Sequence, residues 1–317
     1  MRISVVVPLF NKEKTVARAL ASIAAQSVTD HEVLVVDDGS TDYGAATVAA
    51  WKDSRVRLIQ QANGGPGAAR NTGWRAAQAS LVAFLDADDE WEPEFLARAL
   101  EYLDNPGVAL AAQAWWDEPG SVYPEWAKHW APGFWRVSAA TPVEEFVSRL
   151  AFCSPCTSVV RRDSLERYGG FYSRHGCRYA EDAHFFLKVL LNESVAMDHR
   201  PQARFHREDS ALSGNYRRVR PIEPFLNDPE DVRQVCPAAL RGLLADFLCT
   251  RAMKTAVVLA YWGQREAAAE LREKFLTARA ASLPWYGWSR LGSARVTGAV
   301  FGLLGAAHRR WKAAWAK

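Results

Sequence analysis

The most informative part of the sequence is the stretch Leu81-Val82-Ala83-Phe84-Leu85-Asp86-Ala87-Asp88-Asp89. Its apolar first half is typical of a buried strand. Three carboxylates then follow within four residues, and like charges this close repel one another strongly. A fold tolerates such a cluster best when a cation lies beside it, and carboxylate oxygens suit Mg²⁺ or Mn²⁺ that bridge to phosphates. The alternative is a solvated acidic turn ahead of a helix that begins near Pro93.

The same alternation of strand and helix extends toward the N-terminus. Further strand-like runs cover residues 3–7, 32–36 and 56–59. Helical patterns cover residues 16–23, 68–79 and 94–103. This order predicts an α/β fold with a mostly parallel sheet and helices on both faces. Ligands of such sheets bind at the carboxyl ends of the strands, and polar clusters fall there, after Val7, Val36 and Leu85.

Two of the polar segments have ligand-binding chemistry. Asp37-Asp38-Gly39-Ser40 offers carboxylates to a base or a ribose, although a turn that caps the next helix is an alternative. Residues 64–73 join a glycine-rich loop to a helix start, where the backbone can approach a phosphate and Arg70 can bind it. The segment matches neither the Walker A nor the GxGxxG sequence, so no generic phosphate motif applies.

Four segments together resemble the family 2 glycosyltransferases in order and spacing: residues 7–12, 35–42, 68–73 and 84–89. The resemblance covers residues 1 to about 110, weakens through residues 179–183 and 204–207, and fades after about 215. It implies a GT-A fold, with a Rossmann-like mixed sheet flanked by helices. The catalytic domain would span residues 1–215, divided into a nucleotide-sugar half (1–110) and an acceptor half (111–215).

The resemblance also implies which residues bind the donor. Pro8 and Phe10 would line the nucleobase pocket, and Asp38 would bond the base. Arg70 would lie near the base or the diphosphate, and Asp86 would face the ribose.

The metal site and the general base follow from the same resemblance. Asp88 would hold Mn²⁺ or Mg²⁺ on the diphosphate, and His206 would be an additional ligand, unless it is an ordinary surface or satisfied histidine. Asp182, beside Glu181, would deprotonate the acceptor hydroxyl, because a helix start favours an ionised carboxylate. The alternative for this pair is ordinary acid placement at a helix start. Enzymes of this kind invert the anomeric centre by direct displacement.

The implied function is a metal-assisted, inverting transfer of a sugar from a nucleotide diphosphate sugar, first of all a UDP-sugar. The acceptor would be a hydroxyl of a polysaccharide or glycolipid, in cell-envelope polysaccharide biosynthesis. One alternative is an inactive GT-A-like module that binds nucleotide sugars, and the intact carboxylates argue against it. Another is a nucleotidyltransferase, which needs a glycine-rich loop after the first strand, where Pro8-Leu9-Phe10-Asn11-Lys12 stands instead.

Composition excludes several other classes. With 49% hydrophobic and 24% charged residues the chain is neither disordered nor fibrous. A net charge of +3 is too small for a typical nucleic-acid binder, so we expect no nucleic-acid partner. Five cysteines, with a single C-x-x-C at Cys153 and Cys156, favour a reducing compartment over disulfides or a zinc site. A cytoplasmic location is expected, because residues 3–7 are too short for a signal peptide and no run reaches the roughly 20 residues of a membrane span.

The second half of the chain differs in composition from the first. Five of the 13 tryptophans lie in residues 113–136, which predicts either a loop-rich subdomain packed by indoles or an acceptor surface on which sugars stack. Residues 216–317 form a mainly helical C-terminal region in this interpretation. Aromatic, aliphatic and basic residues interleave from Trp285 onward, as in helices at membrane interfaces. We expect peripheral contact with the inner face of the cytoplasmic membrane, with packing on the catalytic domain or a homodimer as alternatives.

Overall fold

The computed structural model describes residues 2–117, 121–123, 127, 129–209, 221–283, 285–287 and 289. These residues form two compact units. One comprises the described residues of 1–216 and 223–240, and the other those of 217–222 and 241–317. Residues 223–240 lie beyond the predicted boundary at 215 and nevertheless belong to the first unit. The roles assigned to the domains stay predictions.

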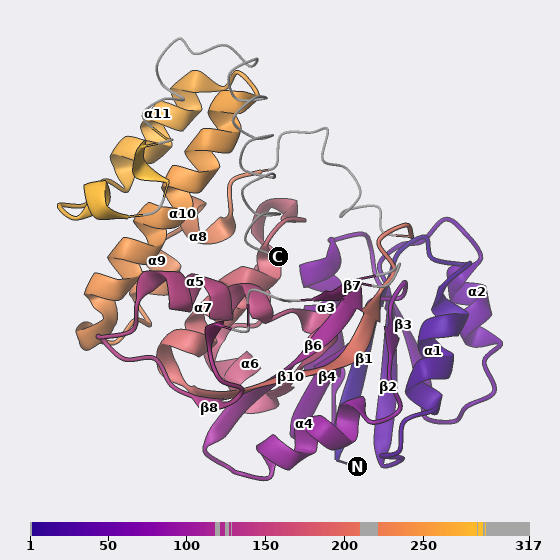
Figure 1. Ribbon diagram of the computed structural model, residues 1–317. Helices are drawn as coiled ribbons and strands as arrows, with labels where there is room; N and C mark the ends of the chain where they lie inside the picture. Colours follow the sequence, from indigo (N-terminus) through magenta and orange to yellow (C-terminus); the bar gives the residue numbers. More distant parts are fainter. Residues whose placement is uncertain are drawn as a thin grey trace. The chain divides into compact units, whose positions relative to one another are not determined.

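The N-terminal part of the first unit is a parallel sheet built from four strands (Figure 1). Strand β1 (Ile3–Leu9) lies between β2 (His31–Asp37) and β4 (Leu81–Phe84), and β3 (Val56–Gln60) pairs with β2. All three pairings are parallel. Each strand is followed by a helix or loop that returns the chain to the opposite end of the sheet, as the alternating pattern predicted.

The register of these strands brings the polar segments to one edge. Leu9 lies opposite Asp37 on β2, and Asp37 lies opposite Gln60 on β3. Val6 pairs with Phe84, the last residue of β4. The segments that follow β1, β2 and β4 therefore leave the sheet side by side, at its carboxyl edge.

The remainder of the sheet is mixed. Strand β9 (Ser158–Arg161) runs antiparallel to both β4 and β6 (Val108–Asp117), and β10 (Ser194–Phe205) runs parallel to β6. The short strands β5 (Glu90–Trp91), β7 (Ser121–Tyr123) and β8 (Gly133–Trp135) pair antiparallel at the margins. The main path is β3-β2-β1-β4-β9-β6-β10-β5. The predicted Rossmann-like mixed sheet is thus confirmed.

In the described part of the first unit, nine α-helices flank or follow this sheet. They are α1 (Val16–Ala24), α2 (Gly44–Ala49), α3 (Pro66–Ala76), α4 (Phe95–Leu103), α5 (Val143–Phe152), α6 (Arg162–Tyr168), α7 (Glu181–Asn192), α8 (Pro224–Asn227) and α9 (Glu230–Arg233). Helix α1 buries the predicted face, Val16, Ala19, Leu20 and Ile23. Helix α3 lies very close to β1, because a Cβ at Gly73 would stand 2.2 Å from a methyl group of Val6.

Two indoles of the tryptophan-rich segment pack inside the first unit. The ring centroids of Trp115 and Trp130 lie 5.8 and 5.2 Å from that of Phe152, and both indoles are buried. Arg149 stacks between Trp130 and Trp135, 4.3 and 4.6 Å from their ring centroids. For these residues the packing interpretation is the one that the contacts favour.

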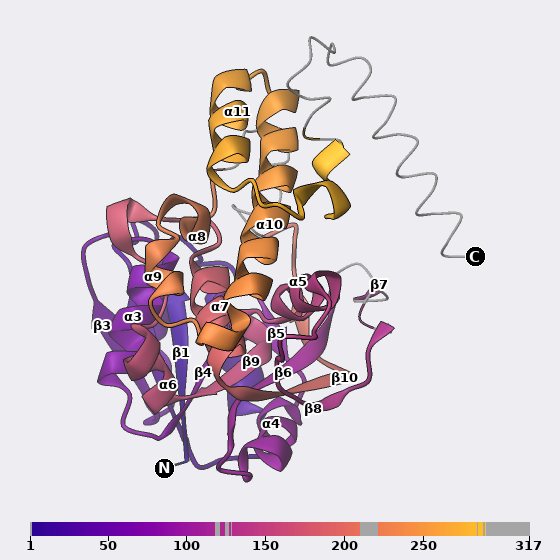
Figure 2. The ribbon, with the colours of Figure 1, turned by 90° about the vertical axis from the view of Figure 1, so that its left-hand side faces the viewer.

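The second unit contains the helices α10 (Arg241–Tyr261) and α11 (Arg265–Lys274), which contact one another, and a short 3₁₀ turn at Ala280–Ser282 (Figure 2). Among the described residues, none of the helices combines the length and the apolarity that crossing a bilayer requires. Residues 284, 288 and 290–317, which carry most of the predicted membrane-contacting or dimerising tail, lie outside the described residues.

Candidate active site

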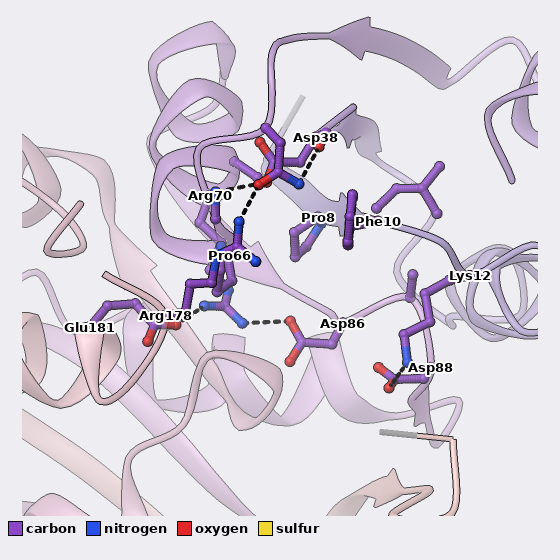
Figure 3. Close-up of a pocket in the computed structure, with 15 residues that line it drawn as sticks. Pro8, Phe10, Lys12, Asp38, Pro66, Arg70, Asp86, Asp88, Arg178 and Glu181 are labelled. Carbon is purple, nitrogen blue, oxygen red and sulfur yellow. Dashed lines mark hydrogen bonds and ion pairs between the residues drawn. The ribbon is translucent and has the colours of Figure 1, made fainter. Parts of the chain in front are cut away.

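A cavity of about 260 Å³ opens at the carboxyl edge of the sheet (Figure 3). Its walls come from the segments after β1, β2 and β4 and from the starts of α3 and α7. The lining residues include six that the sequence singled out: Pro8, Phe10, Asp38, Arg70, Asp86 and Asp88. The structure thus gathers these residues around one space, while their roles toward a ligand stay predictions.

One wall of the cavity is apolar and partly open. Phe10 is 42% exposed although its neighbour Leu9 is fully buried at the end of β1. Pro8 lines the same wall. An exposed aromatic face beside a proline can stack against a planar ring.

Asp38 organises the glycine loop, a role that sequence reasoning missed. Its carboxylate accepts hydrogen bonds from the backbone N–H groups of Gly64 and Gly65, both at 2.8 Å, and from Nε2 of Gln61 at 2.7 Å. Gly65 has a φ of 89°, a left-handed value that favours glycine. The loop before α3 is therefore fixed to the end of β2 by one buried carboxylate.

Arg70 links three parts of the site. Its guanidinium donates to Asp86 at 2.6 Å and to Glu181 at 2.9 Å, and its side chain is buried. It also lies over the ring of Phe171, 5.5 Å from the centroid. Two carboxylates therefore already compensate the charge of Arg70.

Asp88 is paired with a cation that sequence reasoning also missed. Lys12 Nζ donates to the Asp88 carboxylate at 2.6 Å, although Lys12 belongs to the first segment that resembled the family. Burial, and then the charge of Asp86, raise the pKa of Asp88 above the ordinary value. The same two causes, with the charge of Asp88 added, raise the pKa of the neighbouring Asp89 well above it.

A second cavity of about 290 Å³ adjoins the first, because Asp86 and Asp88 line both. His206 lies on it, beyond the end of β10, together with Asp89. The backbone N–H of His206 donates to Asp89 at 3.1 Å, and its Nε2 lies 2.7 Å from Glu90. The structure thus places both predicted metal ligands, Asp88 and His206, on one cavity.

The donor set in these cavities fits a divalent cation. The first cavity is lined by four carboxylates and three basic side chains, so it carries a net negative charge when all are ionised. Carboxylates and one imidazole are ligands suited to Mn²⁺ or Mg²⁺. Burial beside other carboxylates raises the pKa of Asp88, and a bound cation would stabilise its ionised form.

The predicted base lies at the start of α7. Ala180, with a φ of 53°, turns the chain into the helix, and Glu181 rather than Asp182 lines the first cavity. Asp182 accepts a hydrogen bond from the N–H of Ala183 at 2.8 Å. Burial raises the pKa of both carboxylates, and the charge of Arg70 acts against that rise. Glu181 is a site residue that the sequence offered only as the partner of Asp182.

The C-x-x-C pair borders the acidic cluster. Cys156 lines the second cavity and accepts a hydrogen bond from the backbone N–H of Asp86 at 3.3 Å. Burial raises the pKa of the thiols of Cys153 and Cys156, so both are protonated near neutral pH. All five cysteines of the chain are free.

Comparison with solved structures shows the fold. The chain matches the crystal structure of Staphylococcus aureus TarS 1–349 in complex with UDP-GlcNAc with a TM-score of 0.72 and 22% identity, over 92% of this chain and 88% of that one. It matches the mannosyltransferase PcManGT of Pyrobaculum calidifontis, in complex with GDP-Man and Mn²⁺, with a TM-score of 0.57 and 20% identity, over 95% and 87% of the two chains. These likenesses show the GT-A architecture.

Comparison with curated sequences and with family models shows the family. The succinoglycan biosynthesis protein ExoO of Rhizobium meliloti is 44% identical over 110 residues, which are 34% of this chain and 32% of ExoO. The match thus spans about a third of that relative. A family model described as Glycosyl transferase family 2 matches residues 4–169. Since this match covers more than half of the sequence, the chain belongs to glycosyl transferase family 2.

Proposed function

We propose that the chain transfers a sugar, with inversion, from a nucleotide diphosphate sugar to a hydroxyl of a polysaccharide or glycolipid acceptor. The observation that carries the proposal is the cavity at the carboxyl edge, where an apolar wall, a glycine loop and an acidic cluster meet (Figure 3). The related structures of TarS and PcManGT hold UDP-GlcNAc and GDP-Man, which supports this class of donor. A UDP-sugar is our first choice.

The donor would bind along the edge of the sheet. Phe10 and Pro8 offer a surface for the base. Asp38 holds the loop beside it, and three of the about four acceptor sites of its carboxylate are used, which leaves one for the base. The N-terminus of α3, at Pro66, also lies on the cavity. Helix N-termini favour phosphate, because their N–H groups and macrodipole point toward it.

Asp88 and His206, which border the second cavity, would hold the divalent metal, Mn²⁺ or Mg²⁺, and Asp86 would face the ribose. When bound, the metal supplies positive charge to the diphosphate as negative charge develops on it. Lys12 lies 2.6 Å from Asp88 and adds a second cation on the same side. Arg70 supports the leaving group through the field of its buried guanidinium and fixes Asp86 in place.

Asp182 would act as the general base. The acceptor oxygen forms a bond to the anomeric carbon, the bond from that carbon to the diphosphate breaks, and the proton of the acceptor hydroxyl passes to Asp182. A pKa raised by burial suits this task, because a stronger base takes the proton more readily. The salt bridge between Arg70 and Glu181 holds the start of α7 where this transfer would occur.

Nucleotide binding tests the proposal first. Thermal stabilisation is measured with UDP, GDP, dTDP and CMP, each with Mn²⁺ or with EDTA, on the wild type, on Asp88→Asn and on Asp104→Asn. Asp104 is an exposed carboxylate outside both cavities. A ligand at 100 times its dissociation constant adds about 2.7 kcal/mol. We expect one diphosphate to stabilise the wild type and Asp104→Asn with Mn²⁺ only, and Asp88→Asn not at all. No shift with any nucleotide would contradict the proposal.

Product analysis separates the remaining alternatives. A glycosyltransferase releases a nucleoside diphosphate, a nucleotidyltransferase releases pyrophosphate, and an inactive module binds the nucleotide without turnover. We expect nucleoside diphosphate release when the cognate nucleotide sugar is incubated with an envelope polysaccharide or glycolipid fraction. Release of pyrophosphate would overturn the assignment.

We also propose a cytoplasmic enzyme that contacts the inner face of the membrane through its C-terminal tail. Retention in the soluble fraction at low salt, without binding to anionic liposomes, would contradict this membrane contact. Light scattering of the same protein tests the homodimer.

A further inference from the structure

Arg178 differs from the other basic side chains of the donor cavity. Arg70 is paired with Asp86 and Glu181, and Lys12 is paired with Asp88. Arg178 also lines the cavity, but its guanidinium donates to a neutral acceptor, Oδ1 of Asn63, at 2.6 Å. Within the described ranges no carboxylate lies at ion-pair distance from it. Among the described residues, Arg178 is therefore the cation of this cavity that no carboxylate compensates.

The position of Arg178 is built into the fold. It lies in the segment between the 3₁₀ turn Arg174–Gly176 and α7, and this segment packs on the glycine loop. A Cβ on Gly65 would stand 3.1 Å from the carbonyl oxygen of Cys177 and 3.3 Å from Cγ of Arg178. The absent side chain at Gly65 thus lets the segment approach the loop at close range.

The contact also reaches the nucleobase end of the cavity. Asn63, which accepts from Arg178, donates through Nδ2 to the carbonyl oxygen of Asp38 at 2.9 Å. Arg178, Arg70 and Glu181 lie along one side of the cavity, and Lys12 and Asp88 lie on the other (Figure 3). A ligand between these sides would meet the Arg178 guanidinium, for which the described part of the chain supplies one hydrogen-bond acceptor, the neutral amide of Asn63.

We propose that Arg178 is a donor-binding residue that contacts the diphosphate. This inference rests on the proposed function. The cavity is lined by four carboxylates, and the diphosphate brings further negative charge, so an arginine without a carboxylate partner among the described residues favours its binding in addition to the metal. When the Arg178 guanidinium donates to a phosphate oxygen instead of the Asn63 amide oxygen, a charged acceptor replaces a neutral one. Hydrogen bonds to a charged acceptor are shorter and stronger. The planar guanidinium also matches phosphate geometry better than an ammonium does.

The test compares UDP with uridine, which share the base and ribose and differ by the diphosphate. Both are titrated calorimetrically into the wild type, Arg178→Gln, Arg178→Lys and Arg174→Gln. Arg174 is the matched control, because it lies in the preceding 3₁₀ turn and pairs with Asp228 outside the cavity. We expect Arg178→Gln to weaken UDP about 10- to 100-fold with uridine unchanged, Arg178→Lys to weaken it less, and Arg174→Gln to match the wild type. If GDP is the stabilising nucleotide, GDP and guanosine take their place.

Other binding results would contradict either the diphosphate contact of Arg178 or the proposed function. Equal weakening of UDP and uridine in Arg178→Gln would place its contribution at the base end and overturn the diphosphate contact, and unchanged UDP affinity would overturn the inference outright. Absence of any nucleotide binding to the wild type would instead refute the proposed function itself. Unfolding temperatures of all variants without ligand show that a change in affinity does not come from misfolding.

Discussion

The guanidinium of Arg70 on α3 donates a 2.9 Å hydrogen bond to the carboxylate of Glu181, the first residue of α7. The two residues are 111 positions apart in the sequence, and both are buried. Because Arg70 also binds Asp86, at 2.6 Å, one cation connects the acidic strand end to the helix that carries the predicted base. The stability of this region and the position of the predicted base thus depend on the same ion pair.

Removal of Arg70 should therefore be costly. Arg70→Met leaves the buried Glu181 carboxylate without its cation, and breaking a buried pair from one side costs about 3–5 kcal/mol. Urea unfolding measures the loss. Glu181→Gln in the Arg70→Met background should recover part of it, since the amide carries no charge. Arg167→Met, which removes an exposed cation, is the control and should cost about 1 kcal/mol or less. A loss below 1 kcal/mol in Arg70→Met would contradict the prediction.

Asp182→Asn should lower kcat about 100- to 10,000-fold and leave UDP affinity unchanged, because a base acts on the acceptor and not on the nucleotide. Asp163→Asn is the matched control, since Asp163 also lies in the first turn of a helix, α6, but neither it nor an adjacent residue lines a cavity, whereas Asp182 follows Glu181, which does. Near-normal turnover in Asp182→Asn would remove it from the role of base. Normal turnover in Asp163→Asn, beside a loss in Asp182→Asn, would exclude a generic effect at a helix start.

The pH profile follows from the same residue. A base must be deprotonated to act, so kcat should fall as the pH is lowered through the pKa of Asp182. Burial raises that pKa, so the acidic limb should lie above the value of about 3.9 that an ordinary Asp gives. Steady-state rates at saturating donor, in buffers of constant ionic strength, locate the limb. A limb at or below the ordinary value would contradict the effect of burial.

His206 should contribute to metal affinity and Asp88 should be essential to it. We expect Asp88→Asn to abolish Mn²⁺ binding in the presence of UDP and His206→Gln to weaken it, since both residues border the second cavity. Mn²⁺ affinity is measured by the loss of the free-ion electron paramagnetic resonance signal on titration. His129→Gln is the control, an exposed histidine outside both cavities. Unchanged affinity in His206→Gln would leave its Nε2 in the structural contact with Glu90 alone.

Local pattern was enough to predict the four parallel strands in the N-terminal part of the sheet and the main walls of the site. Apolar runs that end in polar clusters located β1, β2 and β4, and the parallel register then brought Phe10, Asp38 and Asp86 to one edge. The predicted boundary at 215 separated residues 223–240 from the unit to which they belong, because the contact that holds them is long-range. Lys188 on α7 pairs with Asp231 on α9 at 2.7 Å, and no periodicity in either segment indicates that pairing.

The hydrogen-bond partners inside the site were beyond sequence reasoning for a similar reason. Asp38 was predicted to bond a base, and the structure shows the same carboxylate holding the N–H groups of Gly64 and Gly65. Residue type and spacing identify a carboxylate at a strand end, but the path of a loop 26 residues later decides what reaches it. The pairing of Lys12 with Asp88, 76 residues away, depends on the sheet register in the same way.

A buried histidine predicts how stability depends on pH. His184 on α7 is 1% exposed, its Nε2 lies 2.7 Å from Asp231, and its ring packs on Tyr172. The pKa of His184 is lowered to about 4, mainly by burial and also by the charge of Lys188, although Asp231 acts in the opposite direction. In the unfolded chain the group protonates near its ordinary value of about 6.5. Between these values the unfolded state binds more protons, so the free energy of unfolding should fall as the pH falls.

The expected difference is large enough to measure. From pH 7 to pH 5 the wild type should lose about 2 kcal/mol more stability than His184→Gln, which cannot be protonated. Urea unfolding at both pH values gives the loss of unfolding free energy for each protein. Carboxylates that titrate equally in both proteins contribute equally to the two losses, so their contribution cancels in the difference. Asp231 stays ionised over this range because its pKa is lowered by its bonds to Lys188 and His184. Equal losses in the two proteins would show that His184 is protonated as readily in the fold as in the unfolded chain.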